Sequence, residues 1–102
     1  MYHARIAFFK CKPGVIDEEI NKSKEELLPF NRSQPGFIAY GVIKFNDDEG
    51  VSIGLWETQA QAENAVQTNM AWVNNNVSEL IESVQNHVGS VSFFSSVKAI
   101  EE

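Results

Sequence analysis

Two kinds of hydrophobic spacing alternate along this sequence, and turns that contain Pro and Gly separate them. Residues 2–9 are rich in aromatic and branched side chains in a two-residue repeat, which is typical of a strand. Residues 16–30 carry apolar side chains at helical spacing, with acidic residues in the first turn, where the helix dipole favours them. The first part of the chain therefore predicts a strand, a break at Lys12-Pro13-Gly14, and a helix that ends near Pro29.

The middle of the sequence predicts a β-hairpin. Ser33-Gln34-Pro35-Gly36 has the composition of a turn, and strand-like segments follow at 37–45 and 51–56. A short polar loop, Asn46-Asp47-Asp48-Glu49-Gly50, joins these segments, so we expect them to pair antiparallel around a solvated tip.

The last part of the sequence predicts a second, split helix and a final strand. Thr58 and Gln61 have the spacing of a capping box, and Asn74-Asn75-Asn76 interrupts the helix because Asn competes for backbone hydrogen bonds. Apolar residues then recur at helical spacing from 77 to 88, which predicts that the helix continues to Gly89. Residues 91–97 are the expected last strand.

The resulting order, β-α-β-β-α-β, is that of the ferredoxin-like α+β fold, an antiparallel four-stranded sheet with helices on one face. No internal repeat or linker divides the chain. Residues 1–102 are expected to form one domain, because the length suits a single hydrophobic core and 43% of the residues are hydrophobic.

The strands are apolar on both faces, although a sheet covered on one side should alternate apolar and polar residues. One set of positions is assigned to the helix-covered core: Ile6, Phe8, Phe37, Ala39, Ile43, Phe45, Val51, Ile53, Leu55, Val91, Phe93 and Val97. The set expected on the uncovered face comprises Phe9, Ile38, Tyr40, Val42, Trp56 and Phe94, interspersed with His3, Arg5, Ala7 and several serines. Such a face presents roughly 300–400 Å². We therefore expect a homodimer formed through it, with a partly polar cavity between the two sheets for a small aromatic or apolar molecule.

Charge and motif content exclude several classes of function. The 8 Lys and Arg against 14 Asp and Glu give a net charge of −6, which disfavours nucleic acid and anionic membranes as partners. Cys11 is the only cysteine, and no nucleotide-binding glycine motif occurs, so we expect no metal and no cofactor. No signal peptide or membrane-spanning apolar run is evident, which predicts a cytoplasmic protein.

Three short motifs occur in the order of a known family: Lys12-Pro13-Gly14, then Gln34-Pro35-Gly36-Phe37, then Leu55-Trp56-Glu57-Thr58. Over residues 2–97 the sequence resembles the antibiotic biosynthesis monooxygenase-like family of the dimeric α+β barrel superfamily. The resemblance implies a homodimer whose sheets pack face to face, and an active site between the sheet and the second helix. Known members include cofactor-independent oxygenases of phenols and haem-degrading enzymes, and others have no known activity, so the fold alone does not fix the function.

Oxidation of a phenol without a cofactor needs a base or a cation that favours the phenolate, and an aromatic wall that holds the ring. The residues of suitable type that could act in catalysis are His3, Arg5, Tyr40 and His87. Those that could bind the substrate are Phe9, Trp56, Trp72 and Phe94. The leading prediction is therefore a cofactor-independent monooxygenase that acts on a small aromatic substrate.

Two alternatives stay open at this point. The first is a non-catalytic homodimer that binds a small molecule or serves as a scaffold, in which Trp56, Trp72 and His87 only pack. The second is a haem-binding or haem-degrading protein. The haem-degrading branch of the family uses an Asn on its first strand, whereas the first predicted strand of this sequence, residues 2–9, contains no Asn. That branch also uses a Trp and a His that are closer in sequence than Trp72 and His87, which are 15 residues apart.

Overall fold

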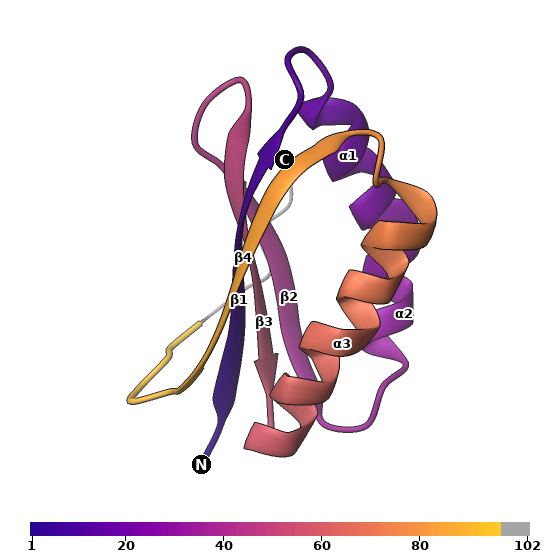
Figure 1. The fold of residues 1–102 in the computed structure, drawn as a ribbon. Coiled ribbons are helices and arrows are strands. Elements are labelled where there is room, and N and C mark those ends of the chain that lie inside the picture. The colour runs from indigo at the N-terminus through magenta and orange to yellow at the C-terminus, as the bar shows by residue number, and fades with distance from the viewer. Residues whose placement is uncertain (97–102) are drawn as a thin grey trace.

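The computed structural model of this protein describes residues 1–96, and it shows an antiparallel sheet with the helices on one face (Figure 1). The elements in chain order are β1 (His3–Cys11), α1 (Ile16–Lys22), η1 (Ser23–Leu27), α2 (Leu28–Arg32), β2 (Phe37–Lys44), β3 (Glu49–Trp56), α3 (Gln59–Asn76) and β4 (Ile81–Ser90). The strands lie side by side in the order β2-β3-β1-β4. The predicted ferredoxin-like fold is confirmed, with α1, η1 and α2 together forming the first helical unit. Within residues 1–96, no helix is both long enough and apolar enough to cross a membrane.

The first helical unit runs from Ile16 to Arg32 and so extends past the end that Pro29 predicted. Its middle segment, η1, is a π-helical turn, and Pro29 follows at the start of α2. Proline lacks the N–H of an α-helical hydrogen bond, and its ring clashes with the carbonyl four residues earlier. A widened turn directly before Pro29 therefore lets the chain stay helical. Ser23 and Leu27 of this turn are buried.

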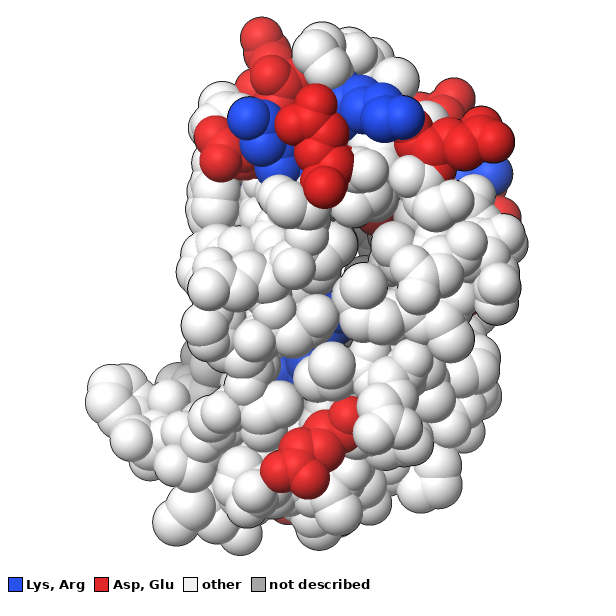
Figure 2. All heavy atoms as spheres, viewed as in Figure 1, with Lys and Arg blue, Asp and Glu red and all other residues white. Residues whose placement is uncertain are grey.

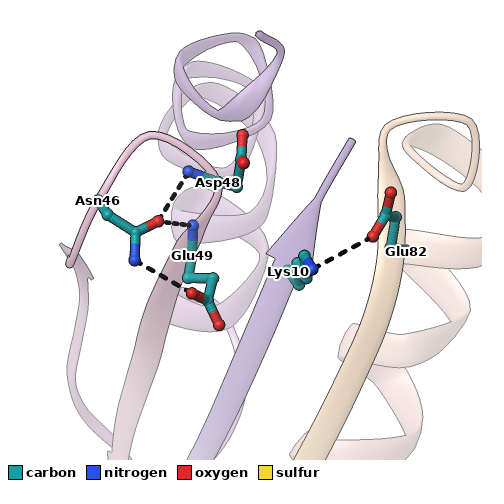
Figure 3. Close-up of polar contacts among 5 residues, drawn as sticks. All are labelled: Lys10, Asn46, Asp48, Glu49 and Glu82. Atoms are coloured by element: carbon teal, nitrogen blue, oxygen red, sulfur yellow. Dashed lines mark hydrogen bonds and ion pairs between the residues drawn. The ribbon is translucent and has the colours of Figure 1, made fainter. Parts of the chain in front are cut away.

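The hairpin of β2 and β3 forms as predicted, and its tip is held by one side chain (Figure 3). The Asn46 Oδ1 atom accepts hydrogen bonds from the backbone amides of Asp48 and Glu49, each at 2.9 Å. The Asn46 Nδ2 atom also donates to Glu49 Oε1 at 3.1 Å. Figure 3 also shows Lys10 of β1 and Glu82 of β4, whose charged atoms lie 3.8 Å apart across the neighbouring strand pair.

The second helix, α3, begins as predicted but ends earlier. The Thr58 side chain accepts from the Gln61 amide, and the Gln61 side chain accepts from the Thr58 amide, which completes a capping box. Asn76 is the last residue of α3, so Asn74-Asn75-Asn76 forms its final turn rather than an interruption. The prediction that a helix continues to Gly89 is wrong.

Residues 81–90 form β4 instead of a helix, because they pair antiparallel along the length of β1. Without this pairing β1 would be an edge strand with unsatisfied backbone groups. The predicted last strand over 91–97 is also wrong for residues 91–96, which form no strand. Val97 lies outside the described residues.

The assignment of the two sheet faces is reversed in the structure. Arg5 lies opposite Gly54 and Val88 on the neighbouring strands, and Tyr40 also lies opposite Gly54. These positions face the helices, where Phe9, Cys11 and Ile16 form one core cluster and Trp56, Ala62 and Ala65 form another.

Three of the residues expected in the core, Phe8, Ile43 and Phe45, lie on the opposite face, which we call the open face, and all three are exposed. Other members of that set are confirmed as buried or packed on the core: Val51 and Leu55 are buried, and Phe37 packs on the Trp56 cluster because the register of β2 shifts between Phe37 and Ala39. Both faces are apolar, so alternation alone does not tell them apart. The small residues Ser52 and Gly54 lie beneath the helices, where Ser52 lines a cavity and Gly54 leaves room for the Trp56 indole.

Candidate functional site

A cavity of about 30 Å³ lies between the sheet and the helices. Its polar lining consists of Arg5, Ser52, Tyr40, Glu19 and Ser23, from three strands and the first helical unit, and the rest of the wall is apolar. Figure 2 shows Lys or Arg atoms deep in a narrow hollow between the sheet and the helices, whereas the other charges in this view gather at the two ends of the molecule. This cavity lies within one chain, beneath its own helices, and Val73 of α3 forms part of its wall, so it lies where the family resemblance implies an active site.

Arg5 is the central polar group of this cavity, and only 3% of its surface is exposed. Its Nε and Nη2 atoms donate to Asn86 Oδ1 of β4 at 3.1 and 2.9 Å. Its Nη1 atom donates to Asn69 Oδ1 of α3 at 3.3 Å and to Ser52 Oγ of β3 at 3.4 Å. Burial lowers the pKa of Arg5, but a guanidinium keeps its proton in proteins. No carboxylate among the described residues forms an ion pair with it, so its positive charge is solvated only by neutral groups.

Two asparagines hold the Arg5 network in place. Asn69 of α3 and Asn31 of α2 are each 1% exposed, and their amides exchange hydrogen bonds of 3.0 and 2.8 Å. This pair joins the two helical units and fixes the oxygen that accepts from Arg5. The sequence analysis missed both residues. The available signal was that Asn69 lies four residues after Ala65, on the same helix face, where an isolated amide is out of place.

Glu19 of α1 is the second ionisable group of the cavity that the sequence analysis missed. It is 6% exposed, and its Oε1 atom accepts a hydrogen bond of 2.7 Å from Ser23 Oγ. Its Oε2 atom has no hydrogen-bond partner among the described residues. Burial raises the pKa of Glu19, and the hydrogen bond from Ser23 only partly opposes this. The sequence places Glu19 beside Asp17 and Glu18 in the first turn of the helix, where the helix dipole alone accounts for an acidic residue.

Tyr40 of β2 is half-buried and faces the same cavity. Burial raises its pKa to about 12, while the positive charge of Arg5 acts in the opposite direction. At neutral pH the Tyr40 hydroxyl is therefore protonated and can donate a hydrogen bond. Phe9 of β1 adds an aromatic ring to the wall.

A second, more open pocket of about 210 Å³ lies beside the start of α3 and is lined in part by Trp56. Trp56 is 2% exposed, and its ring packs edge-to-face on Phe37 with the centroids 5.6 Å apart. Its Nε1 atom has no hydrogen-bond partner among the described residues and lies over Gly54, where an added Cβ would be only 3.0 Å from it. Trp56 therefore lines this second pocket and does not line the Arg5 cavity.

The structure brings together three of the eight candidate residues, Arg5, Tyr40 and Phe9, at one cavity. The other candidates lie elsewhere: His3 Nδ1 is 3.1 Å from Met1 O, Trp72 Nε1 donates to Glu26 Oε1 at 3.3 Å, and Phe94 is 64% exposed. His87 is exposed on β4, where its ring meets Phe8 of the open face with the centroids 6.0 Å apart. Trp72 and His87 are thus not assembled around a haem-sized pocket within residues 1–96.

The order of the strands and the helical layer over one face define the class: the chain has the antibiotic biosynthesis monooxygenase-like fold, as the sequence resemblance predicted. Among solved structures it is similar to a protein of unknown function from Nitrosomonas europaea, with 16% identity, a TM-score of 0.76, and coverage of 96% of each chain. It is also similar to a variant of SnoaB, a cofactor-independent oxygenase from Streptomyces nogalater, with 14% identity, a TM-score of 0.72, and coverage of 91% of this chain and 95% of that chain.

A third similar structure is a proposed antibiotic biosynthesis monooxygenase from Nitrosomonas europaea, with 11% identity, a TM-score of 0.74, and coverage of 93% of this chain and 94% of that chain. No protein-family model matches the sequence, and no curated protein matches it. At these identities the comparisons show a shared fold, and they do not transfer an activity.

Proposed function

We propose that this protein is a cofactor-independent monooxygenase that binds a small aromatic substrate as its phenolate, with the phenolate oxygen on Arg5. The observation that carries the proposal is the buried Arg5 guanidinium, which has neutral partners only. An unpaired buried cation is costly to a fold, and an anionic ligand would offset this cost. The similarity in fold to SnoaB, a cofactor-independent oxygenase, supports the choice of reaction.

The proposed chemistry requires no metal or flavin. Arg5 lowers the pKa of the bound phenol by stabilising its anion, and the neutral Tyr40 hydroxyl donates a hydrogen bond to the same region. The electron-rich phenolate then transfers one electron to O₂, and the two radicals combine to form a carbon–oxygen bond. The substrate supplies all four electrons, because the ring carbon that reacts loses its hydrogen and the phenol becomes a quinone. One oxygen atom becomes the new carbonyl, and the other leaves as water with the hydrogen from this carbon and the phenol proton.

The size of the cavity places a condition on this function. About 30 Å³ holds one or two water molecules and is too small for an aromatic ring. Substrate binding must therefore displace part of the roof, which includes Ser23 and Leu27 of η1 and Val73 of α3. Single π-helical turns are frequent at functional sites, and η1 is the irregular part of this roof.

We also propose that the protein is a homodimer that associates through the open face. Phe8, Ile43 and Phe45 on this face are 45%, 52% and 55% exposed. The rings of Phe8 and Phe45 are 6.4 Å apart, so they form a contiguous apolar surface. Soluble monomers rarely leave such a surface in contact with water, and a two-fold related copy presents the complementary surface.

The test of the oxygenase function is oxygen consumption with a panel of dihydroxyaromatic compounds, measured aerobically and anaerobically. We expect turnover that depends on O₂ and is reduced at least tenfold in Arg5→Met and several-fold in Tyr40→Phe. Arg32→Met is the matched control, because Arg32 is an exposed arginine of α2. Arg5-dependent binding without turnover would instead identify a non-catalytic binding protein. Turnover that Arg5→Met leaves unchanged contradicts the assigned site.

A further inference from the structure

Glu19 and Arg5 line the same cavity from opposite layers, Glu19 from α1 and Arg5 from β1. Both are more than nine-tenths buried, at 6% and 3% exposure. They do not form an ion pair with one another, and Glu19 Oε2 has no partner among the described residues. A folded chain rarely leaves a buried carboxyl oxygen unsatisfied, so this atom needs an explanation.

The other ionisable groups around Glu19 keep a fixed charge under ordinary conditions, whereas the pKa of Glu19 is raised toward the neutral acid by burial. Cys11 of β1 and Tyr40 of β2 both sense its charge, and each has a pKa raised to about 12 by burial. Both therefore stay neutral under ordinary conditions. Arg5, which also faces the cavity, stays protonated. The charge of Asp48, at the tip of the hairpin, also raises the pKa of Cys11 and so further favours the neutral thiol.

We propose that Glu19, as a neutral carboxylic acid, is the second group of this cavity that recognises the ligand. The anionic oxygen of the ligand lies on Arg5, and Glu19 donates a hydrogen bond from Oε2 to another oxygen of the same ligand. The ligand class is then a singly ionised aromatic with two oxygen functions, a dihydroxyaromatic or a hydroxy ketone. A phenol with one oxygen leaves Oε2 unpartnered and binds less tightly. This inference rests on the proposed binding of a phenolate by Arg5 and adds the substrate class.

Ser23 fixes the direction of this donor. Its hydroxyl occupies Glu19 Oε1 at 2.7 Å, so the acid proton is carried by Oε2. Ser23 is also the first residue of η1, the π-helical turn that must move for the ligand to enter. The hydrogen bond from Ser23 to Glu19 therefore links this movement to the group that would recognise the ligand. Ionised Glu19 would repel the phenolate, so binding should weaken as pH rises through the ionisation of this carboxyl.

The experiment compares 4-nitrophenol with 4-nitrocatechol, which carries a second hydroxyl, by absorbance titration without oxygen. We expect the wild-type protein to prefer the catechol about tenfold. Glu19→Gln keeps a side-chain donor, so it should keep most of this preference but lose the decline in affinity at high pH. Glu19→Ala should lose the preference. Glu18→Gln is the matched control, because Glu18 is the exposed neighbour in α1, and it should behave as wild type.

The outcomes separate this inference from the proposed function. Equal affinity for the two probes, with both weakened in Arg5→Met, overturns the role of Glu19 and leaves the phenolate site intact. The same conclusion follows if Glu19→Gln keeps the wild-type pH profile for each probe, since the ionisation of the probe is common to both proteins. Binding of neither probe to wild type overturns the phenolate site itself and this inference with it. Circular dichroism of each variant establishes that it is folded before its binding is compared.

Discussion

The polarity of the two faces of this sheet is the reverse of that in an ordinary sheet with helices on one side. The face beneath the helices contains a buried arginine, Arg5, and a buried serine, Ser52, among its apolar residues. The open face presents Phe8, Ile43 and Phe45, which are about half exposed. In a monomer that folded only for stability, the polar residues would lie on the open face and the apolar residues beneath the helices.

Under the two proposals made above, each face has a purpose beyond the core of one chain. A polar covered face costs free energy, which a ligand-binding site explains. An apolar open face costs solubility, which an interface with a second copy explains. The following predictions test the two halves of this comparison separately, in order of decreasing effect.

The largest effect is expected from Ile43→Glu on the open face. A two-fold interface would contain this charge twice, and burial of both carboxylates is too costly for the dimer to persist. Sedimentation velocity at micromolar concentration should show a dimer for wild type and a folded monomer for the variant. Gln67→Glu, on the exposed side of α3, should remain dimeric. A monomeric wild type would remove the explanation for the open face.

On the covered face, Asn69→Asp places a carboxylate beside Arg5. The Asn69 Oδ1 atom already accepts from Arg5 Nη1 at 3.3 Å, so the new carboxylate would neutralise the cation. The Asn31 amide must turn in this variant, because the substitution replaces the Nδ2 donor to Asn31 Oδ1 with an acceptor. We expect a loss of about 10- to 100-fold in affinity for 4-nitrophenolate, equivalent to roughly 1.4–2.8 kcal/mol. Asn75→Asp, at an exposed position near the end of α3, should bind as wild type. Unchanged affinity in Asn69→Asp means that the charge of Arg5 does not hold the ligand.

The pH dependence of stability measures how far Glu19 is removed from water. Its pKa in the fold is raised above the ordinary 4.5, so the folded state binds its proton more tightly than the unfolded state. Stability from this group is present below pH 4.5 and is lost as pH rises through the folded-state pKa, by at most about 1.4 kcal/mol per pH unit. Urea unfolding over a pH series should show this decline in wild type and Glu18→Gln, but not in Glu19→Gln.

The smallest effect compares one glycine on each face. In Gly54→Ala the new Cβ would lie 3.0 Å from Trp56 Nε1, so the indole must shift by a few tenths of an ångström, at a cost of about 1 kcal/mol. In Gly41→Ala nothing lies within 4 Å of the new Cβ, so we expect a change below about 1 kcal/mol. Urea unfolding of the two variants measures both values. Equal costs would mean that the covered face is no more tightly packed than the open face.

The sequence allowed the fold to be predicted where local signals agreed with the tertiary structure. The capping box at Thr58 begins α3, and the polar loop that starts at Asn46 closes the β2–β3 hairpin. The prediction from the sequence was wrong where pairing between distant strands overrode a local helical pattern. Ile81, Val84 and Val88 have helical spacing, yet β1 needs a partner along this edge, and their segment forms β4.

The candidate site was predicted in part, for the wrong reason. Arg5, Tyr40 and Phe9 share one face, as alternation along the strands predicted, but that face lies beneath the helices. Glu19 and Asn69 were missed because each occurs within a run of similar residues or on a helix stripe, and only the packing of helices on the sheet shows that they are buried. Alternation places residues on a common face, but it does not say which face is covered when both are apolar.

The central claim is that the buried charge of Arg5 makes the covered face a receptor for an aromatic anion. The most direct measurement is the absorbance spectrum of 4-nitrophenol at a pH where the free compound is mostly neutral. Added wild-type protein should bring up the phenolate band, and Arg5→Met should not, while Arg32→Met behaves as wild type. If the compound stays neutral when bound, or ionises equally with Arg5→Met, the anion-binding site does not exist.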